Sequence, residues 1–225
     1  MSTTVNLETL RATPVTKSPF PYLIVPGFVK DEAIADIEAD YPKVTVPGSL
    51  PLASLNYGQN FKRFMEDIRS DEMTAIMTEK FGVDLKDRPT TVTVRGRCRP
   101  TDGKIHTDSK SKLITVLIYM NSKWEQPGGR LRLLNSPNDL NDSFNEVPPV
   151  QGTLLAFLNQ HNSWHGHESF DGERRVIQLN WVRDKGVVWF EQLRHRISAF
   201  LNKQKISYQQ SLVEFKILPI DQFKI

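Results

Sequence analysis

A series of short apolar segments, each long enough for one β-strand, fills the middle of the chain and constrains the fold more than any other feature. All are rich in Val, Ile, Leu or aromatic residues, and they are residues 91–98, 113–119, 130–134, 153–158 and 176–182. Turn-forming sequences such as Asp102-Gly103 and Gly128-Gly129 separate them. Many short strands joined by such turns are typical of a barrel or a double-sheet jelly roll. We therefore predict a mainly β fold with flanking helices.

The chain before this β region is predicted to contain one short strand and several helices. Apolar residues recur at helical spacing within residues 31–40, 61–68 and 73–81, and residues 21–25 resemble a strand. Ser70 can cap the third helix and Gly82 can end it. The remaining polar or Pro- and Gly-rich stretches are predicted to be a loosely held arm at 1–20 and loops at 46–58 and 135–150.

Helical spacing returns in residues 188–203, which precede a mixed tail. The predicted plan is one domain over residues 1–225. It has N-terminal helical support at 20–85, a β core at about 90–183, and a C-terminal helix and tail at 187–225. The apolar residues of that tail could form a homodimer interface or pack on their own domain.

Composition excludes several classes of protein. The 29 Lys and Arg exceed the 26 Asp and Glu by only three, which gives no dense basic stripe for nucleic acid. The longest apolar run, residues 113–120, is too short to cross a membrane. Cys98 is the sole cysteine, so neither an internal disulfide nor a multi-cysteine metal site can form. The N-terminus lacks a secretory pattern, and we predict a cytoplasmic, reducing location.

The tripeptide His106-Thr107-Asp108 is a candidate metal-binding motif. On an extended segment, side chains at positions i and i+2 point to the same face, so the imidazole and the carboxylate can converge. The histidines between residues 161 and 167 offer a third ligand. Two His and one carboxylate on one face of the ion are the ligand set of non-haem Fe(II) oxygenases, although zinc accepts the same donors.

Arg174 follows His165 by nine residues and precedes the apolar strand at 176–182. A buried guanidinium needs an anionic partner, because an unpaired buried charge is too costly. The planar fork of N–H donors suits a carboxylate. A dicarboxylic co-substrate that chelates the metal at one end and binds Arg174 at the other would explain both features.

The order and spacing of these motifs resemble the 2-oxoglutarate/Fe(II)-dependent dioxygenases, in particular their prolyl-hydroxylase-like branch. The matching stretches are His106-Thr-Asp108, Leu117-Ile-Tyr-Met-Asn121 with Trp124, Gly128-Gly-Arg-Leu-Arg-Leu133, Gly152-Thr-Leu-Leu-Ala-Phe157, Trp164-His-Gly166 and Gly172-Glu-Arg174 followed by residues 175–181. The resemblance covers about residues 90–183 and implies a double-stranded β-helix.

The resemblance also implies roles for individual residues. Fe(II) would be held by His106, Asp108 and His165, and the distal carboxylate of 2-oxoglutarate by Arg174 with Tyr119. Thr115 and Leu131 are expected to line the same pocket. Dioxygen would be the oxidant, with ascorbate as a candidate reductant. The implied reaction is hydroxylation of an unactivated C–H bond, with succinate and CO2 as co-products.

Two pairs of neighbouring residues compete for these roles. His167 lies on the same face as His165 if the segment is extended, and it is the alternative third ligand or a substrate-facing residue. Arg175 is the alternative to Arg174, and strand alternation sends the two side chains to opposite faces. The spacing within the family favours His165 and Arg174. His161 is predicted to be an exposed loop residue.

The sequence does not identify the substrate. A prolyl residue of a protein, a free amino acid and a saccharide are all compatible with the motifs. Arg95, Arg97 and Arg99 alternate and would share one strand face. This face is either a solvated surface or a positively charged entrance to the site for an anionic substrate. Two other functions remain open. One is a non-catalytic jelly-roll binding module with a vestigial metal site, and the other is a zinc hydrolase on a similar barrel.

Overall fold

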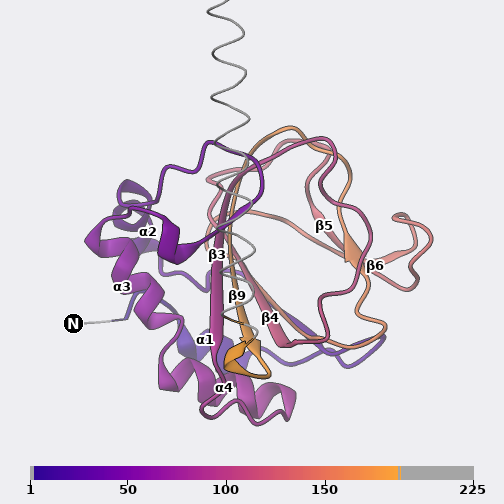
Figure 1. Cartoon of the computed structure of the whole chain (residues 1–225), viewed down its shortest axis with the longest axis horizontal. Coiled ribbons are helices and arrows are strands. Elements are labelled where there is room, and N and C mark those ends of the chain that lie inside the picture. The colour runs from indigo at the N-terminus through magenta and orange to yellow at the C-terminus, as the bar shows by residue number, and fades with distance from the viewer. Residues whose placement is uncertain (1–2, 187, 189–225) are drawn as a thin grey trace, which may run out of the picture. The chain divides into compact units, whose positions relative to one another are not determined.

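Two antiparallel sheets form the centre of the computed structural model, which describes residues 3–186 and 188 (Figure 1). The strands are β1 (Tyr22–Val25), β2 (Ser49–Pro51), β3 (Thr90–Cys98), β4 (Lys112–Tyr119), β5 (Leu131–Leu134), β6 (Ser143–Val147), β7 (Leu154–Leu158), β8 (His165–Gly166) and β9 (Gly172–Val182). The larger sheet has the order β1-β7-β4-β9-β3-β2, and the smaller has the order β6-β5-β8. The predicted mainly β, double-stranded β-helix architecture is confirmed.

Four α-helices and one 3-10 turn precede or interrupt the first strands. They are α1 (Leu7–Ala12), α2 (Asp31–Ala39), η1 (Leu52–Ser54), α3 (Gln59–Asp67) and α4 (Asp71–Phe81). Figure 1 shows α1 to α4 on one side of the larger sheet, away from β5 and β6. The opposite face of that sheet is therefore free to form the interior between the two sheets.

Strand alternation divides the core into two layers. In β4, Val116 and Ile118 join the buried cluster that includes the helices, whereas Leu117 and Tyr119 join the cluster between the sheets. β7 repeats this division, with Ala156 on the helical side and Phe157 between the sheets. Because successive side chains point to opposite faces, a strand buried on both sides appears as a continuous apolar run.

The ends of α4 confirm the predicted helix signals. The Ser70 hydroxyl accepts a hydrogen bond from the Met73 amide at 3.2 Å, which satisfies one free N–H of the first turn. Gly82 ends the helix at φ 64°, a left-handed conformation that glycine adopts without a Cβ clash.

The prediction of a loosely held N-terminal arm is wrong. Residues 7–12 form α1, and Val5 and Leu10 are fully buried. The Asp67 carboxylate accepts hydrogen bonds from the amide and the hydroxyl of Thr4, at 2.7 and 2.6 Å. The segment is too short to show helical periodicity, and its stability comes from packing against distant residues rather than from local preference.

Leu10→Ala is expected to lower the free energy of unfolding by about 2–5 kcal/mol, the usual cost of truncating a fully buried leucine. Chemical denaturation followed by circular dichroism measures this loss. Glu8→Ala is the matched control, because Glu8 lies in the same helix but is exposed. Equal stability of the two variants would contradict an anchored N-terminus.

Two further segments predicted as loops contain short edge strands. β2 pairs with β3 at Leu50–Val94, and β6 pairs with β5 at Arg132–Glu146. These strands have only three and five residues. A strand this short at the edge of a sheet is stabilised by its partner, so local sequence gives little signal.

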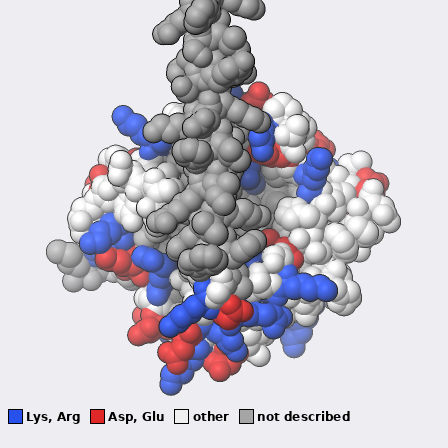
Figure 2. Space-filling model, in the orientation of Figure 1, with Lys and Arg blue, Asp and Glu red and all other residues white. Residues whose placement is uncertain are grey.

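None of the helices in the part of the chain described is long and apolar enough to span a membrane. On the face seen in Figure 2, basic and acidic side chains are interspersed. The predicted C-terminal helix, its tail and the dimer interface assigned to it lie outside the described residues, apart from residue 188.

Candidate metal centre and adjoining cavity

His106 and His165 face each other across a short antiparallel pairing. The His106 amide donates to the His165 carbonyl, and the His165 amide donates to the His106 carbonyl, each at 3.0 Å. Residues paired in this way present their side chains on the same side of the backbone. The centroids of the two imidazole rings are accordingly 4.4 Å apart.

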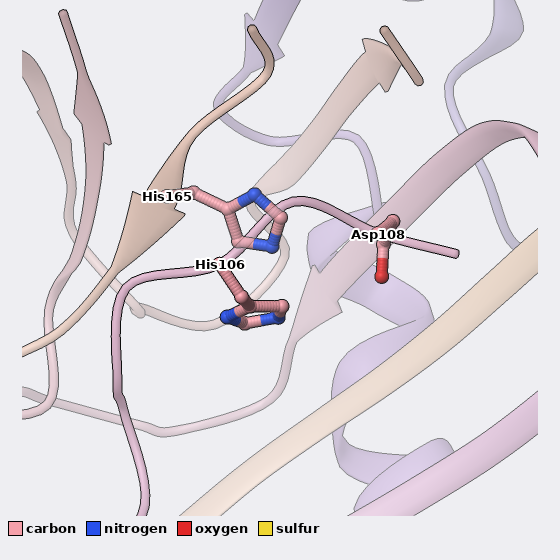
Figure 3. Close-up of side chains that lie close together, drawn as sticks. All are labelled: His106, Asp108 and His165. Carbon is pink, nitrogen blue, oxygen red and sulfur yellow. The ribbon is translucent and has the colours of Figure 1, made fainter. Parts of the chain in front are cut away.

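Asp108 completes a three-residue cluster (Figure 3). One potential ligand atom from each of His106, Asp108 and His165 lies within 4.8 Å of the other two. Asp108 follows His106 in irregular backbone rather than in a named strand. The predicted i, i+2 convergence is achieved without a regular strand.

Backbone carbonyls fix which nitrogen of each imidazole is available. His106 Nδ1 lies 2.8 Å from the Lys104 carbonyl, and His165 Nδ1 lies 2.9 Å from the Ser163 carbonyl. A carbonyl can only accept, so Nδ1 carries the proton and Nε2 keeps its lone pair in each neutral ring. Burial also lowers the pKa of His165 to about 4, which keeps this ring neutral. In this arrangement the Nε2 atoms of both rings are the ones placed to bind a divalent ion.

Asp108 is an ionised carboxylate held at both oxygens. Lys112 Nζ lies 2.7 Å from Oδ1, and the Thr115 hydroxyl donates to Oδ2 at 2.5 Å. Burial alone would raise the pKa of Asp108, but Lys112, His165 and Thr115 together bring it below its usual value. A carboxylate has about four lone-pair sites, so acceptor capacity remains for a metal ion.

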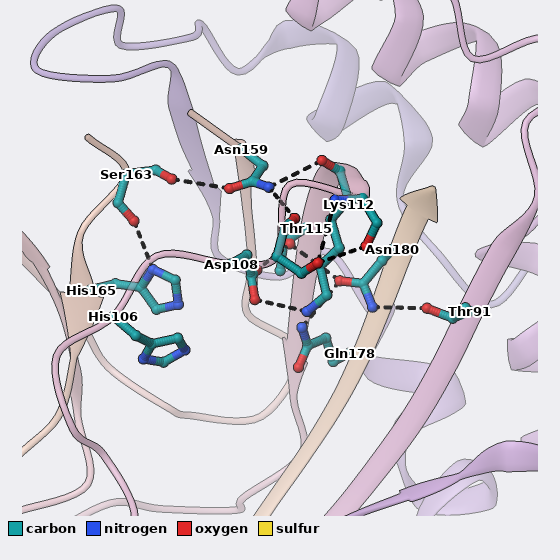
Figure 4. A network of polar contacts seen from close by, with 12 residues as sticks. Thr91, His106, Asp108, Lys112, Thr115, Asn159, Ser163, His165, Gln178 and Asn180 are labelled. Atoms are coloured by element: carbon teal, nitrogen blue, oxygen red, sulfur yellow. Dashed lines mark hydrogen bonds and ion pairs between the residues drawn. The ribbon is translucent and has the colours of Figure 1, made fainter. Parts of the chain in front are cut away.

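A polar network ties the segments that carry the ligands to each other (Figure 4). The Asn159 amide nitrogen donates to the Ser109 carbonyl at 2.6 Å and the Lys112 carbonyl at 3.1 Å. Its amide oxygen accepts a hydrogen bond from the Ser163 hydroxyl at 3.3 Å. The Ser163 carbonyl in turn lies next to His165 Nδ1. The Asp108 and His165 segments are therefore connected through one side chain.

A second branch of the network runs from Asp108 into β9. The Thr115 hydroxyl also lies 3.2 Å from Asn180 Oδ1, and Asn180 Nδ2 donates to the Thr91 hydroxyl at 3.0 Å. Gln178 Nε2 donates to the same Asn180 oxygen at 3.1 Å. Asn180 and Thr115 are buried, so this branch fixes polar groups that would otherwise lack partners.

The metal-ligand cluster opens into a cavity of about 130 Å³. Its walls include the three candidate ligands and the predicted co-substrate residues Arg174, Thr115 and Leu131. Arg95 and His167 line it as well, together with Ser49, Leu117, Val176 and Gln178. The fold thus brings residues from β3, β4, β5, β8 and β9 to one space.

Arg174 is a buried guanidinium without an acidic partner among the described residues. The residue is 4% exposed, and its Nε donates to the Gly129 carbonyl at 2.8 Å. The two terminal nitrogens hold the donors that remain for a ligand. A carboxylate in the cavity would compensate this charge, so the cavity fits an acidic co-substrate. Arg175, by contrast, pairs with Glu173 and Glu38 on the other face of β9.

Tyr119 lies under Arg174 rather than in the wall of the cavity. The Arg174 guanidinium carbon is 5.4 Å from the centre of the Tyr119 ring. Burial raises the pKa of Tyr119, although the charge of Arg174 and a side-chain interaction with it oppose the shift. The buried hydroxyl makes no hydrogen bond of standard geometry within the described residues, and its charged neighbour Arg174 lines the cavity.

His167 lies in the cavity but outside the metal-ligand cluster. Its Nδ1 is 2.8 Å from the Glu168 carbonyl. Burial lowers the pKa of His167 to about 4, and the positive charge of Arg174 contributes to this shift. Gly103 packs directly on this ring at φ 91°, where a Cβ would collide with the imidazole. His161 is exposed, as predicted.

The three alternating arginines at the end of β3 and just after it, Arg95, Arg97 and Arg99, do not form one positive face. The register of β3 and β9 shifts between Arg95 and Arg97, where two residues of β3 lie opposite three residues of β9. Arg95 pairs with Asp102 at 2.7 Å, and Arg99 pairs with the other oxygen of Asp102 at 3.2 Å. Arg97 pairs with Asp171 and lines a separate surface hollow of about 430 Å³. Only Arg95 reaches the cavity.

The Arg95–Asp102 pair predicts a pH-dependent contribution to stability. Burial opposes ionisation of Asp102, but Arg95 and Arg99 bring its pKa below the usual value of 3.8. A depressed folded-state pKa stabilises the fold above the unfolded-state value, and this contribution is lost as pH falls through the folded-state value. Asp102→Asn should therefore cost about 1 kcal/mol at pH 6 and progressively less below pH about 4.

Urea denaturation at several pH values measures the difference. Asp171→Asn serves as the control, because Asp171 makes one ion pair and is 54% exposed. A cost for Asp102→Asn that stays constant down to pH 2 would contradict a charge-dependent contribution.

Sequence reasoning missed three residues around the cavity. Gln178 and Asn180 interrupt an apolar strand at alternate positions, a signal that could have identified them as inward-facing polar groups. Ser49 gave no signal, because it belongs to a short edge strand in a segment rich in Pro and Gly.

Comparison with known families and structures gives one family match. The family model of the 2OG-Fe(II) oxygenase superfamily matches residues 97–183. No curated protein matches this chain in sequence.

Several solved structures resemble the chain at low identity. A prolyl-4-hydroxylase from Pseudomonas putida is 17% identical over 72% of this chain and 88% of its own, with a TM-score of 0.49. A viral collagen prolyl hydroxylase from Paramecium Bursaria Chlorella virus-1 is 16% identical over 72% of this chain and 96% of its own, with a TM-score of 0.46. A 2OG-Fe(II) oxygenase family member from Burkholderia pseudomallei is 13% identical over 72% of this chain and 84% of its own, with a TM-score of 0.47.

Proposed function

We propose that the protein is a dioxygenase that uses Fe(II) and 2-oxoglutarate to hydroxylate an unactivated C–H bond, because the family model of the 2OG-Fe(II) oxygenase superfamily matches residues 97–183. His106, Asp108 and His165 are proposed as the iron ligands, and Arg174 as the residue that binds the distal carboxylate of 2-oxoglutarate. When bound, iron and 2-oxoglutarate supply an oxidative decarboxylation that gives succinate and CO2 and transfers oxygen to the substrate.

One observation supports this proposal most strongly. Arg174 is buried without an acidic partner among the described residues, and it lines the same cavity as the three candidate ligands. A metal site alone would not require this charge. A dicarboxylate that reaches from the ion to Arg174 accounts for both features. A zinc hydrolase would leave the guanidinium without a role.

The chain's own residues would prepare the site before any ligand enters. The Lys104 and Ser163 carbonyls orient His106 and His165, and the Thr115 hydroxyl holds Asp108. These interactions are made between residues of the chain itself and reduce the ordering needed on binding. Leu131 provides an apolar wall, while Tyr119 supplies a buried hydroxyl beneath Arg174.

The substrate side of the cavity is proposed to lie near Arg95 and His167. Both line the cavity, whereas Arg97 lies in the separate hollow described above. Arg95 uses one terminal nitrogen, Nη1, for Asp102, and an anionic group of the substrate is a suitable ligand for the other. Prolyl residues, amino acids and saccharides all remain candidate substrates.

Anaerobic titration of the full chain with Fe(II) and then 2-oxoglutarate tests the function. We expect a visible charge-transfer band only when both are present, and succinate on exposure to dioxygen, with ascorbate added as reductant. Iron binding without the band would contradict the co-substrate assignment. Absence of both iron binding and succinate would favour the non-catalytic binding module.

A further inference from the structure

Lys112 places a second, mostly buried positive charge directly beside the candidate metal ligand Asp108. The Lys112 side chain is 13% exposed, and the Asp108 side chain is 8% exposed. Their charged atoms are 2.7 Å apart. Asp108 is the only acidic partner of Lys112 within the described residues. Lys112 does not line the cavity, and its ammonium group contacts the site at Asp108.

This arrangement is balanced before metal binding and unbalanced after it. The Asp108 carboxylate and the Lys112 ammonium cancel each other in the apoprotein. A divalent ion bound to the same carboxylate adds two positive charges close to the ammonium. Little water is available to screen the repulsion between them, because both side chains of the pair are largely buried.

A dianionic acid is attracted by this excess of positive charge. The ion, Asp108, Lys112 and Arg174 together carry a charge of about +3, which a 2-oxo diacid reduces to about +1. If Lys112 were neutral, the site would attract the same diacid with one positive charge fewer. The ammonium therefore opposes the metal alone and favours the metal together with an anionic co-substrate.

We propose that Lys112 is a positioning residue whose positive charge beside Asp108 weakens binding of the divalent ion alone and strengthens binding of the dianionic co-substrate to the metal-loaded site. The inference rests on the proposed function. It adds a residue to which neither the family match nor the ligand geometry gives a role. It also provides a physical reason for loading the co-substrate tightly only after the ion.

Lys112→Met tests the proposal, because methionine keeps the aliphatic stem and removes the charge. Isothermal titration of the full chain with Mn(II), and then of the Mn(II)-loaded protein with N-oxalylglycine, measures the two affinities without turnover. We expect Mn(II) to bind at least about tenfold more tightly and N-oxalylglycine at least about tenfold more weakly than in the wild type. Opposite changes in two affinities would not arise from a merely structural role.

Three variants complete the experiment. Lys112→Arg keeps the charge and should retain both affinities within a few-fold. Lys110→Met removes an exposed lysine two residues away and should change neither. Lys112→Gln provides a second neutral variant if Lys112→Met does not fold.

The outcomes separate this inference from the proposed function. If wild-type protein binds neither Mn(II) nor N-oxalylglycine, the proposed function fails. If the wild type binds both and the neutral variants are unchanged, the role of Lys112 is refuted while the function stands. Loss of Mn(II) binding in both neutral variants would also refute it, because Lys112 would then serve only to hold Asp108.

Discussion

His165→Ala is expected to weaken Fe(II) binding by at least about 100-fold and to abolish the charge-transfer band with 2-oxoglutarate. The remaining ligands, His106 and Asp108, both come from one short segment. Without His165, the ion has no ligand from the facing segment. His165 also approaches the site with Nε2 already free and the ring held by the Ser163 carbonyl. Its loss therefore removes a pre-oriented donor and not only a contact.

The measurement is anaerobic titration with Fe(II), read by the band and by calorimetry, after circular dichroism has established that the variant folds. His161→Ala is the matched control, because His161 is an exposed histidine only four residues away. His167→Ala tests the competing ligand. It should keep iron binding, since His167 lies outside the three-residue cluster. A normal band in His165→Ala with a lost band in His167→Ala would exchange their roles.

Those parts of the fold and the site that depend on local spacing could be predicted from the sequence. Alternating side chains divide β4 between two cores, and the Ser70 and Gly82 signals mark the ends of α4. The i, i+2 spacing of His106 and Asp108 predicts that their side chains converge. The approach of His165 to these two residues depends instead on backbone pairing with His106, and only the resemblance to a family suggested it.

Features that depend on tertiary pairing could not be predicted in this way. α1 is held by burial and by the Thr4–Asp67 hydrogen bonds, and Arg95 lines the cavity whereas Arg97 lines a separate hollow, next to a shift in the register of β3 and β9. The Lys112–Asp108 ion pair has i, i+4 spacing, which signals contact in a helix but not in a turn leading into a strand. In each case the missing information is a partner that is distant in sequence or a local irregularity of the backbone.

Arg174→Met is expected to weaken binding of 2-oxoglutarate to the iron-loaded protein by about 100- to 1,000-fold. The breaking of a buried ion pair typically costs about 3–5 kcal/mol, and the lower part of this range, about 3–4 kcal/mol, corresponds to the expected loss of affinity. Iron affinity should be nearly unchanged, because Arg174 is not among the clustered ligands. The free variant should be as stable as the wild type or more stable, since it no longer buries an uncompensated charge.

Arg175→Met is the matched control for this prediction. It is the next residue in the same strand, but its side chain is 35% exposed and pairs with Glu173 and Glu38. Calorimetry with 2-oxoglutarate and then with pyruvate, which lacks the distal carboxylate, separates two causes of weakened binding. If Arg174 recognises that carboxylate, the wild type should prefer 2-oxoglutarate strongly and Arg174→Met should lose the preference. A preference that survives in Arg174→Met would mean that another residue binds the distal carboxylate, and the buried guanidinium would then need a different anionic partner.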